Sequence, residues 1–379
     1  MRIAHITDCY HPRVGGIELQ VQGLARAQAA AGHHVEVITA TPTDGPSDSA
    51  GSPDGDRGDD IPIHRLSVSL PFDLPVSPYV GDRLVALLRR RGIEVVHVHA
   101  GLVSAFAYPA LRSAVRAGIP GLVTVHSLWR PWQPGFRLAD LAVGWRDWPV
   151  AWTAVSPAAA GDVQRVLGDR ALVEVLPNGV DTTWWRRHDT SRPPGEEVLI
   201  VAVQRLAARK RTVPLLRILD RTRRLVPRSV PIHAIIVGDG PHAPLAARRI
   251  RRLGLDWVTL AGRRSQPEIR ALYEQADLFL AAAHLESFGI AALEARTAGL
   301  PVLAMTDAGI ATFIRDGVEG LLAPDDHALA RALARLIRDQ GLRERIAAHN
   351  RTTGTDHDWP HVVAAADRHL HRALDLRRT

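Results

Sequence analysis

Short apolar runs alternate with longer amphipathic or polar segments along the whole chain. In the first part the runs lie at residues 3–7, 35–39, 63–65, 95–99, 122–125, 153–155 and 173–176, and in the second at 198–203, 232–237, 258–260, 278–282 and 302–304. Short, almost uninterrupted apolar runs are typical of buried strands, and several of the segments between them have the period of helices. The pattern therefore predicts an α/β protein built on parallel sheets.

A polar segment at residues 184–197, which contains Pro193, Pro194 and Gly195, divides this pattern into two parts. A chain of 379 residues is long enough for two domains that each bury a core. We therefore expect an N-terminal Rossmann-like domain at 1–183, a linker at 184–197 and a second Rossmann-like domain at 198–355. The pattern beyond residue 325 is helical, and the terminal segment 356–379 is expected to hold one last helix.

Composition describes an ordinary globular protein, with 46% hydrophobic and 23% charged residues. No run reaches the roughly 18 apolar residues of a transmembrane helix, and the first residues lack the hydrophobic region of a signal peptide. The single cysteine, Cys9, agrees with a reducing compartment and is expected to be a small buried residue rather than a nucleophile. We therefore expect a cytoplasmic protein, and leave open whether it attaches to the inner face of the membrane.

The balance of charges favours acidic partners. The formal net charge is +7 and the isoelectric point is near 10.5, which suits nucleotide sugars, anionic lipid headgroups or nucleic acid. Arginines cluster at residues 89–91, 221–224 and 248–252. Each cluster also fits the solvated face or last turn of a helix, so none of them identifies the partner.

One stretch, residues 128–152, is unusually rich in tryptophan and arginine. It holds five of the nine tryptophans, interleaved with three arginines: Trp129, Trp132, Trp145, Trp148 and Trp152 with Arg130, Arg137 and Arg146. Tryptophan beside arginine suits a membrane interface, and it equally suits stacking on a sugar, an aglycone or unpaired bases. A hydrophobic patch that covers the end of a sheet is the third interpretation, and the sequence leaves all three open.

A strand, a tight turn and a helix start follow one another at residues 277–299. Gly289 stands at the turn, where the free N–H groups of the new helix would suit a phosphate. Glu294 lies five residues further on, roughly 7 to 8 Å along the helix axis. A diphosphate at the helix start and a ribose diol on Glu294 would fit that span. A plain amphipathic helix fits the same spacing.

The chain uses arginine for every cation but one. Lys210, the only lysine, follows the apolar strand 198–203 together with Arg205. A position that keeps a compact ammonium in such a chain suggests a need for a point charge with rotatable donors. Both residues stand after the carboxyl end of a strand, where open α/β sheets bind their ligands. A pair of surface cations is the alternative.

Three motifs, taken in order, resemble the nucleotide-sugar half of the retaining glycosyltransferases of family 4. The motifs are Arg205 with Lys210, the turn 238–241 that begins at Gly238, and the segment 286–294 that holds Ser287, Phe288 and Gly289 between two glutamates. The likeness extends over nearly the whole chain. It implies the GT-B fold, which consists of two Rossmann-like domains facing a central cleft with a C-terminal helix that crosses back to the first domain. It also implies a nucleotide-sugar donor.

The first half carries further parts of the resemblance. Gly15 and Gly16 stand at a strand-to-helix turn that, in the family, approaches the donor diphosphate. His126 follows the strand 122–125, and the resemblance places it at the sugar ring. The segment 95–128 is similar to family members that move N-acetylglucosamine onto inositol phospholipids. From the residues alone, a tight turn would explain the glycines and a core or capping position would explain the histidine.

The resemblance implies a role for each of these residues. It assigns catalysis to His126, Arg205, Lys210 and Glu286. It assigns donor binding to Gly15, Gly16, Arg205, Lys210, Gly238, Glu286, Ser287, Phe288, Gly289 and Glu294, with Glu294 on the ribose hydroxyls. It further implies transfer with retained anomeric configuration and neither a metal nor another cofactor.

Metal ligands are not expected from the residues either. The 18 histidines are scattered, without the spacing of a zinc site. Asp54, Gly55 and Asp56 imitate a metal-binding glycosyltransferase motif, but they lie in the polar segment 41–60, which is expected to be a mobile loop. The triplet 356–358 is discounted in the same way.

Two departures from the family pattern affect the predicted site. Lys210 is followed by Arg211 where the family usually has glycine. The loop 308–312 reads Ala-Gly-Ile-Ala-Thr where Gly-Gly-Ile-Pro-Glu is common, so Thr312 replaces an acidic residue. Any contact that this acidic residue makes to the donor is missing here.

The leading hypothesis is a retaining, metal-independent transferase that uses a UDP sugar, first N-acetylglucosamine, with a lipid, an inositol or a small-molecule acceptor. A mannosyl or other hexosyl transferase with a GDP sugar is one alternative, and an inactive nucleotide-sugar-binding scaffold is another. A nucleic-acid binder rests only on the charge and the tryptophan-rich stretch, and is not expected. A pyridoxal-dependent phosphorylase is disfavoured because Lys210 already belongs to the phosphate motif.

Overall fold

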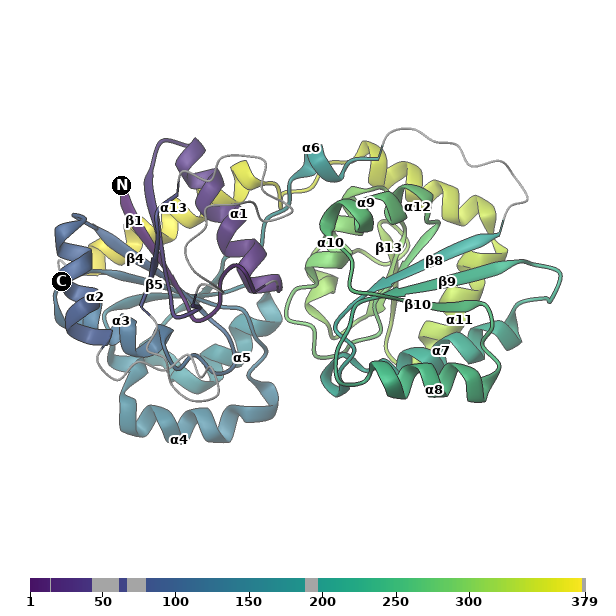
Figure 1. Ribbon diagram of the computed structural model, residues 1–379, viewed down its shortest axis with the longest axis horizontal. Coiled ribbons are helices and arrows are strands. Elements are labelled where there is room, and N and C mark those ends of the chain that lie inside the picture. The colour runs from purple at the N-terminus through teal and green to yellow at the C-terminus, as the bar shows by residue number, and fades with distance from the viewer. Residues whose placement is uncertain (14, 43–60, 67–79, 188–196, 377–379) are drawn as a thin grey trace. The chain divides into compact units, whose positions relative to one another are not determined.

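The computed structural model describes residues 1–13, 15–42, 61–66, 80–187 and 197–376 (Figure 1). Asp54, Gly55 and Asp56, most of the segment expected to be a mobile loop and most of the predicted linker lie outside these residues. The chain forms two compact units, and each is built on its own sheet. The first unit combines Met1–Gly179 with His357–Thr379, and the second comprises Val180–Asp356.

The first unit holds a seven-stranded parallel sheet in the order β3-β2-β1-β4-β5-β6-β7. Its strands are β1 (Arg2–Thr7), β2 (His34–Thr39), β3 (Ile63–Arg65), β4 (Val95–Ala100), β5 (Gly121–Val125), β6 (Val150–Ala154) and β7 (Val173–Val175). Its helices are α1 (Gly16–Ala30), α2 (Val80–Arg90), α3 (Ala107–Arg116), α4 (Gln133–Val143), α5 (Pro157–Leu167) and α13 (Trp359–Leu376), with 3-10 turns η1 (Arg130–Trp132), η2 (Trp145–Asp147) and η3 (Gly168–Arg170).

The second unit holds a six-stranded parallel sheet in the order β10-β9-β8-β11-β12-β13. Its strands are β8 (Val198–Val203), β9 (Ile232–Val237), β10 (Val258–Gly262), β11 (Leu278–Leu280), β12 (Val302–Met305) and β13 (Gly320–Ala323). Its helices are α6 (Thr182–Trp185), α7 (Thr212–Leu225), α8 (Ala243–Leu253), α9 (Gln266–Gln275), α10 (Ile290–Thr297), α11 (Asp326–Arg338) and α12 (Gln340–Thr352), with 3-10 turns η4 (Ala208–Lys210) and η5 (Gly309–Thr312).

The terminal helix α13 belongs to the first unit, as the family resemblance implied. Its buried face, which includes Val362, Ala366 and Leu370, joins one hydrophobic cluster with Ile3 of β1 and Leu122 of β5. The N-terminal strand and the C-terminal helix therefore share a core, although nearly the whole chain separates them. None of the helices in the described ranges is long and apolar enough to cross a membrane.

The predicted strands are all present, with ends that differ by a few residues, and one strand was missed. The strand β13 lies at the edge of its sheet and contains only four residues, so it lacks a long apolar run. Trp184 and Trp185 were assigned to the linker but belong to helix α6, where Trp185 packs against Tyr273 of α9. Cys9 is half-buried rather than buried, and loss of hydration raises the pKa of its thiol.

Candidate functional site

Loops at the carboxyl ends of β8, β9 and β11 carry the predicted residues of the second unit. β8 lies between β9 and β11 in the sheet, so the three loops are neighbours at one edge. Arg205 and Lys210 follow β8, Gly238 follows β9, and Glu286 follows β11. Parallel strands place their carboxyl ends on the same side of the sheet, which is where open α/β sheets bind ligands.

An ion pair joins two of these loops. The Lys210 ammonium lies 2.5 Å from a carboxylate oxygen of Glu286. Both side chains are partly accessible, at 30% for Lys210 and 19% for Glu286. A strong pair that is still open to solvent fixes both side chains and leaves atoms of each available to a ligand. The structure therefore brings together two residues that lie 76 positions apart in the sequence.

The conformation of Arg211 shows how the chain accommodates an arginine where the family usually has glycine. Arg211 has the left-handed backbone conformation, with φ 56° and ψ 42°, and it is the sole non-glycine residue with positive φ in the described chain. Its guanidinium forms two hydrogen bonds of 2.8 and 2.9 Å to Asp326 and one of 2.9 Å to the Ala282 carbonyl. Glycine would adopt this conformation without strain. Here the bonds of the side chain offset the strain and hold the Lys210 turn against the segment after β11 and the start of α11.

The turn into α10 requires glycine. Gly289 caps the helix with φ 95°, and a Cβ atom there would lie 2.3 Å from the Ile310 side chain. The altered loop supports the same turn, because the Gly309 N–H donates a 2.7 Å hydrogen bond to the Glu286 carbonyl. The first N–H groups of α10 therefore begin directly after the loop that carries Glu286, as the sequence predicted.

Gly238 allows the loops after β8 and β9 to approach closely. Its φ is 127°, and a Cβ atom there would lie 2.0 Å from the Gln204 carbonyl oxygen. Arg205, which directly follows Gln204, is exposed. Ser287 is half-buried, whereas the Phe288 ring is buried against Phe313, at a centroid distance of 5.2 Å. The side chain of Phe288 is therefore part of the core.

Glu294 is a buried carboxyl group on the second turn of α10. Its residue is 8% exposed, and burial raises the pKa of Glu294 to about 8. A buried carboxylate is costly unless it receives hydrogen bonds. Two hydroxyl groups of a bound diol would supply such bonds.

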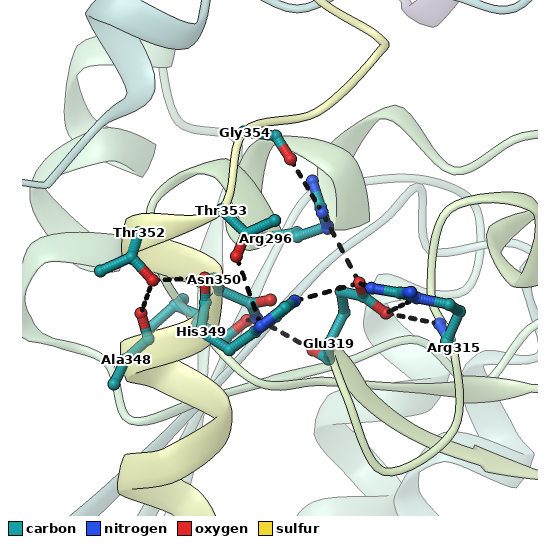
Figure 2. A network of polar contacts seen from close by, with 10 residues as sticks. Arg296, Arg315, Glu319, Ala348, His349, Asn350, Thr352, Thr353 and Gly354 are labelled. Atoms are coloured by element: carbon teal, nitrogen blue, oxygen red, sulfur yellow. Dashed lines mark hydrogen bonds and ion pairs between the residues drawn. The ribbon is translucent and has the colours of Figure 1, made fainter.

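A second carboxyl group fixes the far end of α10 (Figure 2). Glu319 is 2% exposed and accepts hydrogen bonds from the Arg315 side chain at 2.6 Å and from His349 at 3.2 Å. Arg296 of α10 lies 3.8 Å from the same carboxylate and donates to the Gly354 carbonyl. Burial alone would raise the pKa of Glu319, but the hydrogen bonds from Arg315 and His349 outweigh it and lower the pKa to about 2. The network connects α10 to α12 and to the segment before β13.

The first unit carries the remaining predicted residues at the same edge of its own sheet. Gly15 is the N-cap of α1 and Gly16 is its first residue, so free N–H groups begin there. His126 follows β5, and its backbone N–H bonds to the Ala100 carbonyl at the end of β4. His126 is half-buried, and burial lowers its pKa to about 4.

His126 also contacts a group of buried histidines. Its Nε2 atom lies 3.1 Å from Nδ1 of His99, and Nε2 of His99 lies 2.8 Å from Nδ1 of His5. Nitrogen atoms of His5, His97 and His99 all lie within 4.8 Å of one another, a spacing that a metal ion could use. Four of the 18 histidines, from three separate strands or strand ends, therefore meet inside the first unit.

Comparison with known proteins matches both halves of the chain to glycosyltransferase families. The model described as "Glycosyltransferase Family 4" matches residues 14–184, and the model described as "Glycosyl transferases group 1" matches residues 185–353. The two matches follow each other without a gap and together cover residues 14–353, which hold every strand of both sheets except β1. The chain belongs to the family 4 glycosyltransferases, with the GT-B fold.

Relatives of this glycosyltransferase differ in their sugars. It is 26% identical to a phosphatidylinositol N-acetylglucosaminyltransferase subunit of Arabidopsis thaliana, over 99% of the chain and 82% of the relative. It is 28% identical to the GDP-mannose:cellobiosyl-diphosphopolyprenol alpha-mannosyltransferase of Xanthomonas oryzae, over 100% and 98%. Its fold matches Anabaena Alr3699/HepE, solved with UDP and glucose, with a TM-score of 0.74, 19% identity, and 98% and 99% of the two chains covered.

The tryptophan-rich stretch of the glycosyltransferase is mostly core. Trp129, Trp145 and Trp152 are at most 7% exposed, whereas Trp132 is 59% exposed. The buried rings support the interpretation of a patch that covers the sheet, and they are out of reach of a membrane or a sugar. The accessible apolar surface comes instead from α4, where Leu138 and Leu141 are 70% and 76% exposed.

Sequence reasoning missed three features of the glycosyltransferase. The backbone of Arg211 gives no local sign, although the glycine usual in the family at that position was a signal. Glu319 looks like any surface glutamate, because its partners come from other segments. The histidine group had a readable signal: His97 and His99 alternate along one strand, and His5 pairs with His97 in the sheet register.

Proposed function

We propose that this glycosyltransferase moves a hexose from a nucleotide diphosphate sugar to a lipid, an inositol or a small-molecule acceptor, with retention of configuration. UDP-N-acetylglucosamine is the first candidate donor and GDP-mannose is the alternative. The name of the Arabidopsis relative supports N-acetylglucosamine as the sugar, and the name of the Xanthomonas relative supports GDP-mannose as the donor. An assay with both donors therefore chooses between them.

One observation carries the proposal. The Lys210–Glu286 pair, the free N–H groups at the start of α10 and the buried Glu294 carboxyl group follow one another at a single edge of the second sheet. Cation and N–H groups suit a diphosphate, and a carboxyl group one helical turn further on suits a ribose diol. A nucleoside diphosphate presents these two chemistries at about this spacing.

The same groups suit the chemistry of transfer. As the bond between the anomeric carbon and the phosphate oxygen breaks, negative charge grows on the diphosphate and positive charge on the sugar. Arg205, Lys210 and the α10 N–H groups would stabilise the leaving diphosphate. The acceptor oxygen forms the new bond on the same face, and its proton passes to the leaving phosphate. We propose that these side chains take the place of a metal ion.

A transfer assay tests the proposal. The purified protein, with EDTA present, is incubated with UDP-N-acetylglucosamine or GDP-mannose and inositol or phosphatidylinositol, and the anomeric configuration of the product is read by NMR. We expect turnover with one donor and an α-linked product from an α-linked donor. Lys210→Ala should lower turnover, whereas Arg209→Ala, which removes the neighbouring exposed cation, should not. Tight nucleotide binding without turnover for any acceptor class would favour the inactive scaffold.

A lipid acceptor requires contact with a membrane, and we propose that α4 provides it. Leu138, Leu141 and the nearby Trp132 form an exposed apolar surface, and the exposed Arg137 lies on the same helix. Such a surface suits an anionic bilayer interface. Cosedimentation with vesicles containing phosphatidylglycerol should fall for the variant with Leu138→Glu and Leu141→Glu. The matched variant Leu225→Glu changes a leucine that is 45% exposed in the second unit and should bind normally.

A further inference from the structure

A row of hydrogen-bonded side chains runs through the core of the first unit and ends at His126. It begins at Gln28 of α1, whose amide oxygen lies 2.8 Å from Nε2 of His5 in β1. It continues from Nδ1 of His5 to Nε2 of His99 in β4 at 2.8 Å, and from Nδ1 of His99 to Nε2 of His126 at 3.1 Å. Gln28 and His5 are 0% exposed and His99 is 2% exposed, so His126 is the one member that reaches the surface.

The direction of every bond in this row follows from the orientation of the Gln28 amide, whose oxygen faces His5 while its nitrogen has no partner among the described residues. An amide oxygen only accepts, so His5 donates from Nε2 and carries its lone pair on Nδ1. His99 must then donate from Nε2 and accept at Nδ1. By the same step, His126 donates from Nε2 and carries its lone pair on Nδ1.

The row consists of neutral rings. Burial lowers the pKa of His5 and of His126 to about 4 and that of His99 well below its ordinary value. A neutral imidazole has one donor and one acceptor nitrogen, so fixing one nitrogen fixes the other. All three rings therefore have the same polarity: each donates a hydrogen bond from Nε2 and carries its lone pair on Nδ1.

The direction of a neighbouring row of hydrogen bonds is set in the same way, by a backbone carbonyl group. Thr153 donates to the Val123 carbonyl, so Thr124 donates to Thr153 and His97 donates from Nε2 to Thr124. Nδ1 of His97 then carries a lone pair that has no partner among the described residues. His97 lies beside the row and is not a member of it.

We propose that Gln28, His5 and His99 are positioning residues that hold His126 as a neutral imidazole with its lone pair on Nδ1, so that it serves sugar transfer as a hydrogen-bond acceptor. The use of this polarity in transfer rests on the proposed function; the polarity itself does not. A neutral acceptor adds no positive charge beside a sugar ring that becomes positive, and it suits a hydroxyl group as its partner. A histidinium would oppose that charge.

The same cluster has the spacing of a metal site, but its geometry favours hydrogen bonds. Nδ1 of His5 and Nε2 of His99 lie 2.8 Å apart, the distance of a shared hydrogen. Two nitrogens bound to one zinc ion at tetrahedral angles would lie further apart, at roughly 3.3 Å. The ligand set would also place two positive charges in the core with three neutral ligands.

Substitution of Gln28 tests the direction of the row. In Gln28→Glu the new carboxyl group and His5 form either an ion pair or a neutral acid–imidazole pair, since a lone buried charge is costly. Both pairs place a hydrogen on Nδ1 of His5. His99 and His126 must then reverse, so Nδ1 of His126 becomes a donor. Gln22→Glu is the control, because Gln22 lies on the same helix and contacts His11, outside the row.

The measurement is the ¹⁵N chemical shift of the ring nitrogens in histidine-labelled full-length protein, which distinguishes protonated from unprotonated nitrogen. His126 is assigned by the signals that His126→Gln removes. In the unsubstituted protein, between pH 6 and 8, we expect a protonated Nε2 and an unprotonated Nδ1 for His126. The reverse pattern, or a doubly protonated ring, would overturn the inference without any variant. A one-to-one Zn²⁺ complex that shifts the rings of His5, His97 and His99 would also overturn it.

A separate assay of sugar transfer tests whether His126 uses this polarity. Gln28→Glu should reverse the pattern at His126 and lower kcat at least about tenfold, with KM for the donor nearly unchanged, while Gln22→Glu changes neither. A reversed His126 with normal kcat would contradict the role in transfer. Absence of turnover in the unsubstituted protein, with the expected ring pattern, would contradict the proposed function and leave the polarity established.

Discussion

Replacing Glu294 by glutamine tests two effects of this buried carboxyl group: how much it destabilises the fold, and how much it contributes to nucleotide binding. Burial raises the pKa of Glu294 to about 8, from an ordinary value of 4.5. The folded state therefore holds a proton that the unfolded state releases, and the free energy of unfolding decreases as pH rises between those two values. Stability from this group is complete below pH 4.5 and is lost as pH passes 8. Glutamine has nearly the same shape and does not titrate.

The magnitude follows from the width of that interval. Each pH unit inside it costs about 1.4 kcal/mol, so between pH 6 and pH 8.5 the stability of Glu294→Gln should rise relative to the original protein by about 2.5 kcal/mol. Urea unfolding of both proteins at pH 6, 7, 8 and 8.5 measures the difference, and other titrating groups cancel because the two proteins share them. A constant difference across this range would refute the raised pKa.

Nucleotide affinity should increase as pH rises, whereas the stability of the fold decreases. Ribose hydroxyls donate to a carboxylate, so binding favours the ionised form, and at pH 7 only about a tenth of Glu294 is ionised. The dissociation constant of the preferred nucleotide should therefore fall up to about tenfold from pH 7 to pH 9. Calorimetry in two buffers of different ionisation enthalpy should count nearly one proton released at pH 7. Glu294→Gln should release none and should bind weakly at every pH.

Three further changes probe the loops around this group. Lys210→Ala should lower kcat/KM by about 10²-fold or more, since it removes one stabilising donor from the leaving diphosphate, with circular dichroism unchanged; full activity would exclude Lys210 from the site. Arg211→Gly should be more stable than Arg211→Ala by about 1 kcal/mol in urea unfolding, because both lose the bonds to Asp326 and only glycine is unstrained at φ 56°; equal stabilities would contradict the strain. Gly289→Ala should unfold at least about 1 kcal/mol more easily and bind nucleotide weakly, owing to strain and the contact with Ile310, whereas Gly254→Ala, at φ 64° with open space around it, should cost stability alone.

The sequence was informative where a feature depends on neighbouring residues. Strands buried on both faces appear as apolar runs, so both sheets could be predicted, and only the short edge strand β13 escaped. The segment 286–294 could be interpreted because its turn, its glycine and its helix are contiguous. Lys210 stood out as the only lysine, after a strand end together with Arg205, and the resemblance then connected both residues to Glu286, which no local pattern does.

Features that depend on distant partners could not be predicted. The burial of Glu294 and the packing of the Phe288 ring against Phe313 depend on residues distant in the sequence, so neither has a local sign. The sequence left open whether Trp129 and Trp152 lie at a membrane, on a ligand or over the end of a sheet, and they prove to be the largest fully buried side chains of the first unit. Whether a large aromatic ring lies inside or outside depends on the elements around it, which the spacing of tryptophan and arginine does not reveal.

The central claim is that the carboxyl edge of the second sheet binds a nucleotide diphosphate through Lys210, the start of α10 and Glu294. A thermal-shift screen against UDP, GDP, dTDP and ADP in EDTA tests it most directly, run in parallel on the original protein, Lys210→Ala and Arg209→Ala. At about 100 times its dissociation constant, a ligand should add about 2.7 kcal/mol of stability. We expect one nucleotide to stabilise the original protein and Arg209→Ala but not Lys210→Ala. Stabilisation by none of them, or an equal shift in Lys210→Ala, would contradict the claim.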